Sequence, residues 1–293
     1  MPMRYKLTHR TKYSYLGSVS TYHSLVCLQP RTLPEQICHA FSLHITPHPV
    51  ELVARTDFFG NTIHYFSLDV SHRELTVVAQ SDVESLPKEP VLTHLSMSCA
   101  EAYSYVWNTR SVKTELLQYL LPSPFIAWDD EIKHFAEGCF PENLSLYEGI
   151  KGLCRKIFTE FDFVSNFTNV HTSLKTVLKE RKGVCQDFSH LAIASLRSLG
   201  FPARYVSGYI ETLPPPGKKK LQGSDASHAW ISAFIPSVGW CEFDPTNNMV
   251  PGERHIVTAY GRDYGDIAPL KGIIFSSGKH TLSVEVDVIP HLK

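Results

Sequence analysis

The alternation of hydrophobic and polar residues divides the chain into three stretches. Up to about residue 85 the period is two, as in "KLTHRTKYSY" (6–15) and "ELTVVAQSDV" (74–83), and Phe41, Leu43 and Ile45 share one face. Turn residues such as the Gly-Asn of "DFFGN" separate these segments. Short strands at close spacing are typical of a β-sandwich, which we expect over this region.

Helical spacing replaces the alternation between about residues 112 and 200. In the stretch 144–160, Leu146, Ile150, Leu153 and Ile157 recur three or four residues apart. Thr172 is placed to cap a short helix over 173–181, and Gly200 ends a longer helix that begins near Cys185. Two further helices are predicted at about 112–121 and 129–138.

Beyond residue 202 the period returns to two. The predicted strands cover 203–210, 228–235, 240–244, 255–261 and 281–289. The segment "TLPPPGKKKLQGSDA" (212–226) is rich in Pro, Gly and Lys and is predicted to be a loop. Strands at both ends with helices between them predict an α+β fold.

Composition excludes several classes of function. Among the 293 residues, 28 Lys and Arg balance 29 Asp and Glu, so the net charge of −1 gives no basic surface for nucleic acid. No apolar run approaches the roughly 18 residues of a membrane helix, and the N-terminal stretch lacks the apolar core of a signal peptide. We therefore expect neither a nucleic-acid nor a membrane partner.

The seven cysteines favour reduced thiols over a disulfide framework. They are odd in number, dispersed, and form no C-x-x-C pair, so a cytoplasmic location is expected and the indication of zinc is weak.

Cys185, in "RKGVCQDFSHL" (181–191), stands out by its place at a predicted helix start. Unpaired N–H groups and the positive end of the helix dipole stabilise a thiolate there. On a regular helix, at about 100° per residue, Asp187 and His190 lie about 200° and 140° around from the thiol. Neither can serve it, and capping and core hydrogen bonds are the simpler account of both. Cysteines are also often buried and inert, so this stretch alone leaves both interpretations open.

A hairpin supplies a more distant histidine and acid. His228 begins one predicted strand and Asp244 ends its partner, with "PSVG" between the two strands. A hairpin centred on residue 236 places even-numbered residues of both strands on one face, and a register slip of two still leaves the pair beside or diagonal to each other. A carboxylate in that position orients an imidazole and stabilises its charged form.

These segments resemble a known family. "GVCQDFSHL", "SHAWISAFIPSVGWCEFDPTN" and "HIVTAYGRDYGDIAPLKG" are similar to the transglutaminase-like superfamily, in its bacterial branch of proposed cysteine proteases. "THRTKYSY" and "DFFGN" resemble the β-rich N-terminal region that accompanies that core. The resemblance implies a papain-like core, with Cys185 as nucleophile, His228 as base and Asp244 as the orienting acid.

The implied organisation has three parts. Residues 1–88 form the β-rich N-terminal domain, 89–125 a helical connector and 126–293 the transglutaminase-like catalytic core. Six histidines of the first part are expected to be dispensable for chemistry, namely His9, His23, His39, His44, His48 and His64. The N-terminal domain is expected to contribute substrate positioning or stability.

The expected activity is thiol acyl transfer on amide bonds of a peptide or protein substrate, through a thioester and without a cofactor. Hydrolysis is favoured over amine cross-linking, because no amine site is identifiable in the sequence. Trp230 and Tyr209 are candidates for a second oxyanion donor. The alternatives are a protein-glutamine transglutaminase, a non-catalytic protein-binding module, and a zinc site at Cys185 and His228.

Overall fold

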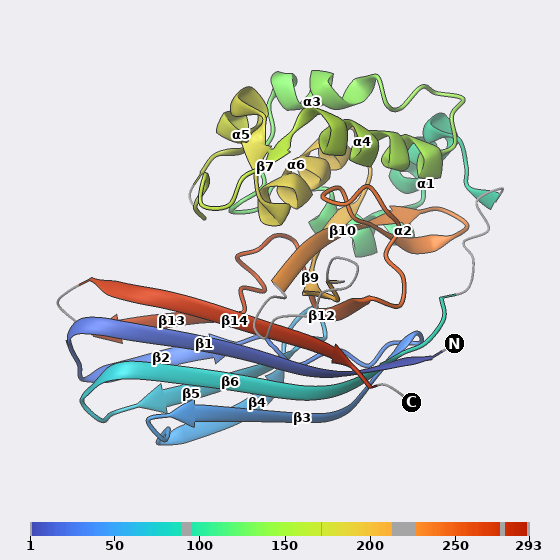
Figure 1. The fold of residues 1–293 in the computed structure, drawn as a ribbon. Coiled ribbons are helices and arrows are strands. Elements are labelled where there is room, and N and C mark those ends of the chain that lie inside the picture. The colour runs from blue at the N-terminus through green and yellow to red at the C-terminus, as the bar shows by residue number, and fades with distance from the viewer. Residues whose placement is uncertain (1, 89–94, 171, 213–226, 276–278, 292–293) are drawn as a thin grey trace, which may run out of the picture.

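The computed structural model describes residues 2–88, 95–170, 172–212, 227–275 and 279–291. The chain forms two halves, a stack of β-sheets and a helical layer over a smaller sheet (Figure 1). The predicted loop at 212–226 lies, apart from its first residue, outside the described residues. The mixed architecture confirms the predicted α+β fold class.

Two four-stranded antiparallel sheets form the N-terminal sandwich. The first has the strand order β14-β1-β6-β3, from His280–Pro290, Met3–Val19, His72–Ser85 and Gln36–Thr46. The second has the order β13-β2-β5-β4, from Leu270–Phe275, Thr21–Val26, Thr62–Leu68 and Glu51–Thr56. Between them lies an apolar core that includes Tyr15, Val26, Phe66, Leu75 and Val77. In β1, β2 and β6 the period-two pattern buries one face of the strand, as predicted, whereas every residue of β4 is exposed.

The last two strands belong to this sandwich. β14 pairs with β1 from Tyr5↔Pro290 to Tyr15↔His280, and β13 pairs with β2. The sequence assigned 126–293 to the catalytic core, whereas the structure returns residues 270–290 to the N-terminal sheets. Period two identified these segments as strands, but it carries no information on which sheet receives them.

The helical layer comprises six α-helices and the 3₁₀ turn η2 among the described residues. They are α1 (Cys99–Asn108), α2 (Arg110–Leu116), η2 (Leu117–Tyr119), α3 (Asp130–Glu137), α4 (Leu146–Glu160), α5 (Leu174–Glu180) and α6 (Cys185–Ser198). α1 lies ahead of the first predicted helix and begins with a capping box between Ser98 and Glu101. The cap of α5 is Ser173, which accepts a hydrogen bond from the Thr176 N–H, so the prediction of Thr172 was wrong by one residue.

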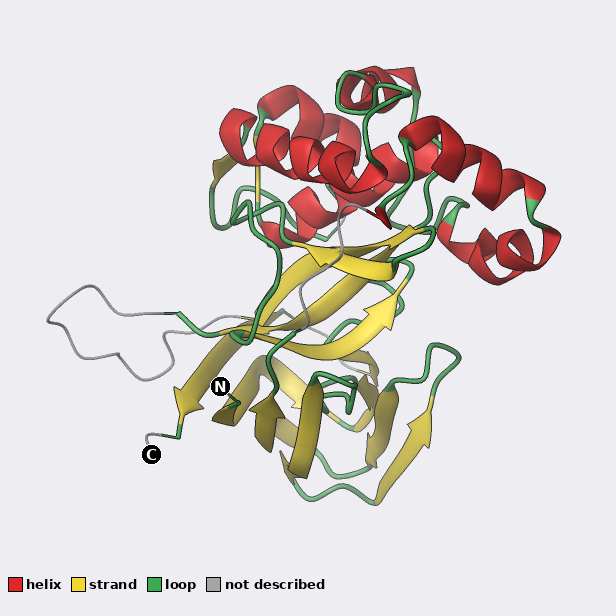
Figure 2. Cartoon of the chain, turned by 90° about the vertical axis from the view of Figure 1, so that its right-hand side faces the viewer, coloured by secondary structure: helices red, strands yellow, loops and turns green. Residues whose placement is uncertain are grey.

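A four-stranded sheet of order β11-β10-β9-β12 lies between the helices and the sandwich (Figure 2). Its strands are β9 (Ala203–Ile210), β10 (Ser227–Ile235), β11 (Gly239–Phe243) and β12 (His255–Gly261). Ile231 and Ala233 pack with Leu191 of α6 in the main core, whereas Tyr209 and Ile256 pack with residues of β1 and β14. The sheet therefore connects the helices to the sandwich. The two-residue strands β7 (Asp162–Phe163) and β8 (Lys182–Gly183) pair in parallel just before α6.

Candidate active site

The start of α6 is fixed by a carboxylate from its own first turn. Asp187 accepts hydrogen bonds from the Val184 N–H at 2.8 Å and from the Thr168 hydroxyl at 2.6 Å. Burial raises the pKa of Asp187, and the two hydrogen bonds oppose that shift. A Cβ on Gly183 would lie 2.9 Å from the Asp187 Cβ, so a glycine is needed there. These contacts place half-buried Cys185 as the first residue of the helix.

His190 has a structural place in the core. Its Nε2 accepts a hydrogen bond from the Tyr264 N–H at 3.1 Å, and its ring stacks on Phe125. Burial lowers the pKa of His190 to about 4, so the ring is neutral at pH 7. Asp187 and His190 therefore make the capping and core contacts that the sequence indicated.

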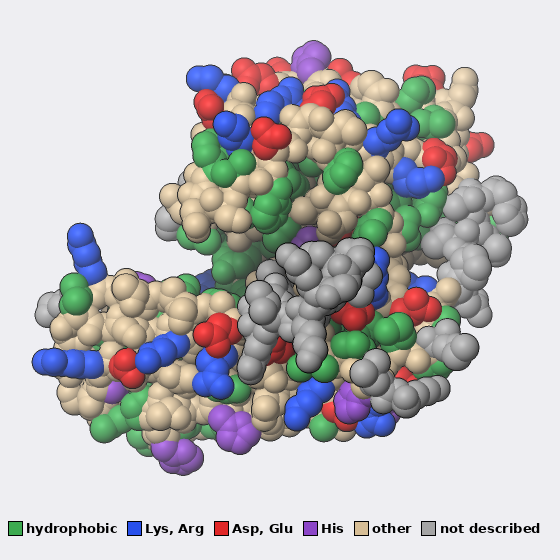
Figure 3. Space-filling model, viewed as in Figure 1, with side chains coloured by type: hydrophobic (Ala, Val, Ile, Leu, Met, Phe, Trp, Pro, Cys, Tyr) green, Lys and Arg blue, Asp and Glu red, His purple; other side chains and the backbone are tan. Residues whose placement is uncertain are grey.

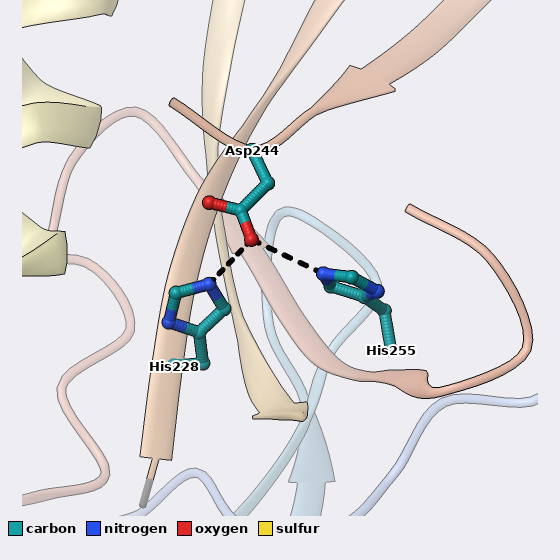
Figure 4. A group of neighbouring side chains, drawn as sticks. All are labelled: His228, Asp244 and His255. Carbon is teal, nitrogen blue, oxygen red and sulfur yellow. Dashed lines mark hydrogen bonds and ion pairs between the residues drawn. The ribbon is translucent and has the colours of Figure 1, made fainter. Parts of the chain in front are cut away.

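The hairpin of β10 and β11 brings His228 and Asp244 together. The pairs Ile231↔Phe243 and Ile235↔Gly239 centre the turn on residue 237, one residue later than predicted. Asp244 is then diagonal to His228, and the His228 Nε2 lies 2.7 Å from the Asp244 Oδ2 (Figure 4). The predicted shared face of even-numbered residues accounts for this contact.

Asp244 is a fully buried acceptor of several hydrogen bonds. Its Oδ1 accepts the backbone N–H groups of Thr246 and Asn247, and its Oδ2 also accepts the Asn247 amide at 2.7 Å. Burial opposes the charge, but the hydrogen bonds from His228, His255 and Asn247 hold the pKa of Asp244 well below its usual range. The group is therefore a carboxylate at neutral pH.

His228 connects this carboxylate to the cysteine. Burial acts against the charged ring, but hydrogen bonds to Asp244 and Cys185 raise the pKa of His228 to about 10. Because Nε2 faces Asp244, Nδ1 is the nitrogen left for the sulfur, and it points away from the carboxylate in Figure 4. The structure thus gathers Cys185 from the start of α6, His228 from β10 and Asp244 from the residue after β11.

His255 is a further member of the group that the sequence analysis missed. Its Nε2 lies 3.2 Å from the Asp244 Oδ2, opposite His228 (Figure 4). Burial lowers the pKa of His255, so a neutral ring donates this hydrogen bond. His255 begins the β12 strand and was one of 15 histidines. β12 is separated from the hairpin by β9 in the sheet, and His255 reaches Asp244 and Trp230 through its side chain, which no local sequence pattern indicates.

The same three side chains offer ligand atoms of the kind that bind a metal ion. The ligand atoms of His228, Asp244 and His255 all lie within 4.8 Å of one another. The sequence-based zinc alternative instead used Cys185 with His228. In the structure Cys185 lies outside this set, so the two arrangements are different.

The sheet of β11, β10, β9 and β12 is called the middle sheet from here on. Cys185 and His228 line a cavity of about 280 Å³ between α6, the middle sheet and the sandwich. The two predicted oxyanion donors do not line it. Trp230 is fully buried against His255, and the Tyr209 hydroxyl contacts His9. Tyr205 lines the cavity instead, and burial raises its pKa well above the usual value, so its hydroxyl stays protonated. Tyr205 is the donor candidate that the sequence analysis overlooked.

A helix that begins with a cysteine and packs on an antiparallel sheet with a buried His–Asp pair is the arrangement of a thiol-dependent enzyme in general. Comparison with known proteins gives the family. Residues 5–84 match the bacterial transglutaminase-like N-terminal region, and residues 133–245 match the transglutaminase-like superfamily. The chain belongs to the transglutaminase-like superfamily.

Similar chains occur in mycobacteria. An uncharacterized protein of Mycobacterium tuberculosis is 38% identical over 98% of this chain and 93% of its own length. One from Mycobacterium leprae is 30% identical over 97% of this chain and 98% of its own. The crystal structure of a "putative cysteine protease" from Cytophaga hutchinsonii covers 100% of this chain and 92% of that chain, at 23% identity and a TM-score of 0.78. This structural likeness confirms the fold.

Within the described ranges, no helix has the length and apolarity needed to cross a membrane. All seven cysteines are free thiols.

Proposed function

We propose that the protein is a cysteine acyl-transfer enzyme that hydrolyses amide bonds of peptides or proteins. The observation that carries this proposal is the position of His228, which contacts the buried Asp244 carboxylate through one ring nitrogen and interacts with Cys185. A cysteine, an imidazole and an orienting acid in this order are the components of nucleophilic acyl transfer.

The proposed reaction has two steps. The Cys185 thiolate attacks the amide carbonyl carbon, a C–S bond forms, and the C–N bond breaks as the imidazolium of His228 gives its proton to the departing amine. Neutral His228 then takes a proton from water, the resulting hydroxide attacks the thioester, and the carboxylic acid product leaves as the C–S bond breaks. Asp244 stays ionised throughout and stabilises the imidazolium.

The negative charge that develops on the carbonyl oxygen needs hydrogen-bond donors. The N–H groups of the first turn of α6 have no partner within the helix and point towards its start, where Cys185 lies. Tyr205, whose hydroxyl stays protonated, lines the same cavity. We propose these groups as the oxyanion site.

Water is proposed as the acceptor because the cavity offers no counter-charge to a protonated amine. No Asp or Glu is among the described residues that line it. A primary amine would lose its hydration there without an ionic partner. Free thiols are required for this chemistry, which fits the reducing cytoplasm that we propose as its location.

The test is product analysis with a peptide library, in the presence and absence of a primary amine. We expect new carboxyl termini or deamidated side chains by mass, unchanged when the amine is added, and no product from Cys185→Ser. Amine-linked products would favour the transglutaminase alternative. A folded protein without turnover, in which Cys185 reacts with iodoacetamide no faster than the other thiols, would favour the binding module.

A further inference from the structure

One face of the first sandwich sheet meets three different parts of the molecule along its length, namely the second sandwich sheet at one end, the middle sheet at the other end and a cavity between them. Odd-numbered residues of β1 lie opposite even-numbered residues of β14, so both sets share this face. Near one end, Tyr15 packs on the second sheet of the sandwich. Near the other, Leu7 and Val288 pack on Tyr209 and Ile256 of the middle sheet.

Between these two contacts the face forms a wall of the cavity that holds Cys185. The residues of this wall are His9, Thr11, Tyr13, Leu282 and Val284. The N-terminal sandwich and its C-terminal strand therefore take part in the environment of the proposed nucleophile. No part of the chain between residues 99 and 261 supplies these side chains.

The part of the wall that β14 supplies is apolar and exposed. Leu282 and Val284 are 53% and 48% exposed, and Pro269 and Leu270 continue the lining beside them. Hydrophobic side chains also gather in the hollow between the helical half and the sandwich in Figure 3. Exposed apolar surface that faces a cavity gains free energy when a ligand covers it, at about 25 cal/mol per Å².

The wall also carries no formal charge at neutral pH. No Lys, Arg, Asp or Glu is among the described residues that line the cavity. His9 is buried, its Nδ1 contacts the Tyr209 hydroxyl at 2.9 Å, and its Nε2 contacts the Thr11 hydroxyl at 3.1 Å. Burial lowers the pKa of His9 to about 4, so its ring is neutral at pH 7.

We propose that Tyr13, Leu282 and Val284 form a specificity subsite that receives an uncharged, apolar side chain on the acyl side of the substrate. The inference rests on the proposed function and adds a substrate class to it. The acyl group remains bonded to the Cys185 sulfur after the amine departs, so its side chain is the one held in this cavity. At about 280 Å³ the cavity lies just below the roughly 300–1,000 Å³ of drug-sized ligand sites, a size suited to one side chain with its backbone.

The subsite predicts discrimination by charge. The wall offers an acidic or basic side chain no ionic partner, so such a side chain would lose hydration there and be disfavoured by at least about tenfold. A charged residue introduced into the wall should instead favour a substrate side chain of the opposite charge.

The experiment measures alkylation of Cys185 by leucyl, aspartyl and lysyl chloromethyl ketones, each rate divided by the rate with iodoacetamide. Iodoacetamide has no acyl side chain, so the ratio reports the subsite alone. The wild-type protein should prefer the leucyl reagent by at least about tenfold. Val284→Glu should shift the preference towards the lysyl reagent, and Val284→Lys towards the aspartyl reagent, each by about tenfold.

Ile289 supplies the matched control. It lies on the same strand and is 51% exposed, but its odd number places it on the opposite face of β14. Ile289→Glu and Ile289→Lys should leave all three ratios as in the wild type. Leu282→Glu and Leu282→Lys repeat the test at a second wall position.

Wild-type ratios without preference would overturn the inference. The inference would also be overturned if the Glu and Lys variants of Leu282 and Val284 reacted with iodoacetamide at the wild-type rate and kept the wild-type ratios for all three chloromethyl ketones. Failure of the proposed function has a different signature, namely no amide turnover while the chloromethyl ketones still discriminate.

Discussion

Asp244 accepts five hydrogen bonds although its side chain is fully buried. This carboxylate sets the charge of His228, and the charge has a consequence for stability. Although burial opposes it, hydrogen bonding to Asp244 and Cys185 raises the pKa of His228 to about 10. The value in an unfolded chain is about 6.5. The stabilisation of the folded protein by the charged His228 is therefore complete below about pH 6.5 and is lost as the pH rises towards 10.

We expect His228→Gln to reduce the free energy of unfolding more at pH 6 than at pH 10. The substitution removes the charged partner of Asp244, which contributes only while the ring is protonated. Urea unfolding of both proteins at the two pH values measures the difference. An equal loss at both would show that the ring is not held in its charged form.

His255 is a positioning residue in this account, because it reaches the sulfur only through Asp244 and His228. His255→Phe removes the hydrogen bond to the Asp244 Oδ2, whereas His255→Gln can keep a donor there. A hydrogen bond to a charged group is worth about 1.5–3 kcal/mol. We expect the phenylalanine variant to lower the single-turnover acylation rate by about tenfold or more and the glutamine variant to retain most of it. The pH profile of the rate should shift in His255→Phe and not in His255→Gln. A profile of His255→Phe that matches the wild type would argue for a purely structural role of His255.

The contrast between His228 and His255 shows what the sequence could predict about single residues. His228 and Asp244 lie on one hairpin, so strand period and turn position were sufficient to pair them. His255 and Tyr205 lie on β12 and β9, whose adjacency depends on sheet order. No local pattern reports that order, which is why both were missed.

The contact between β9 and β12 depends on a glycine. A Cβ on Gly208 would lie 2.0 Å from the Ile256 carbonyl oxygen and 2.6 Å from the Trp230 ring. Gly208→Ala should therefore destabilise the protein by about 1–3 kcal/mol, because backbone and a buried ring must both move.

Gly252→Ala is the control for that prediction, since no atom lies within 4 Å of its added Cβ. We expect it to change the free energy of unfolding by less than about 0.5 kcal/mol. Thermal or urea unfolding of the two variants gives the comparison. Equal stabilities would contradict the close packing of β9 on β12.

Helices and strands were predicted more reliably than their ends. The apolar spacing of residues 144–160 gave α4 (Leu146–Glu160) almost completely. Thr172 and Ser173 are both good caps, and only the geometry of the Ser173 side chain decides between them. The hairpin centre moved by one residue because Ser237 and Gly239 adopt left-handed φ values of 71° and 100°, which the letters "PSVG" do not specify.

The return of residues 270–290 to the N-terminal sheets joins the two halves of the molecule. A chain that ends at Pro269 keeps Cys185, His228 and Asp244 but loses the partners of β1 and β2. We expect this truncation to unfold at lower temperature, because Val286 and Val288 no longer pack on Tyr209 and Ile256. It should also lose the preference for the leucyl reagent, because Leu282 and Val284 are removed from the cavity wall. A chain that ends at His291 is the control. Unchanged melting and labelling would show that the core is independent of these strands.

The arrangement of the halves was the least predictable feature. Local periodicity gave the class of each half and the resemblance gave its family, but the pairing of β14 with β1 joins segments more than 260 residues apart. Such pairing depends on the whole folded sheet. The N-terminal region was predicted to contribute substrate positioning or stability, and the wall that it gives the cavity around Cys185 agrees with that, but the sequence did not show which of its residues form the wall.

The central claim is that Cys185 carries the acyl group during the reaction. Intact-mass spectrometry of the full chain, quenched in acid during turnover of an amide substrate with an apolar acyl residue, tests it directly. We expect an adduct with the mass of the acyl group, mapped to Cys185, removed by hydroxylamine and absent from Cys185→Ser. Product formation without an adduct, an adduct on another residue, or turnover by Cys185→Ser at the wild-type rate would contradict the account.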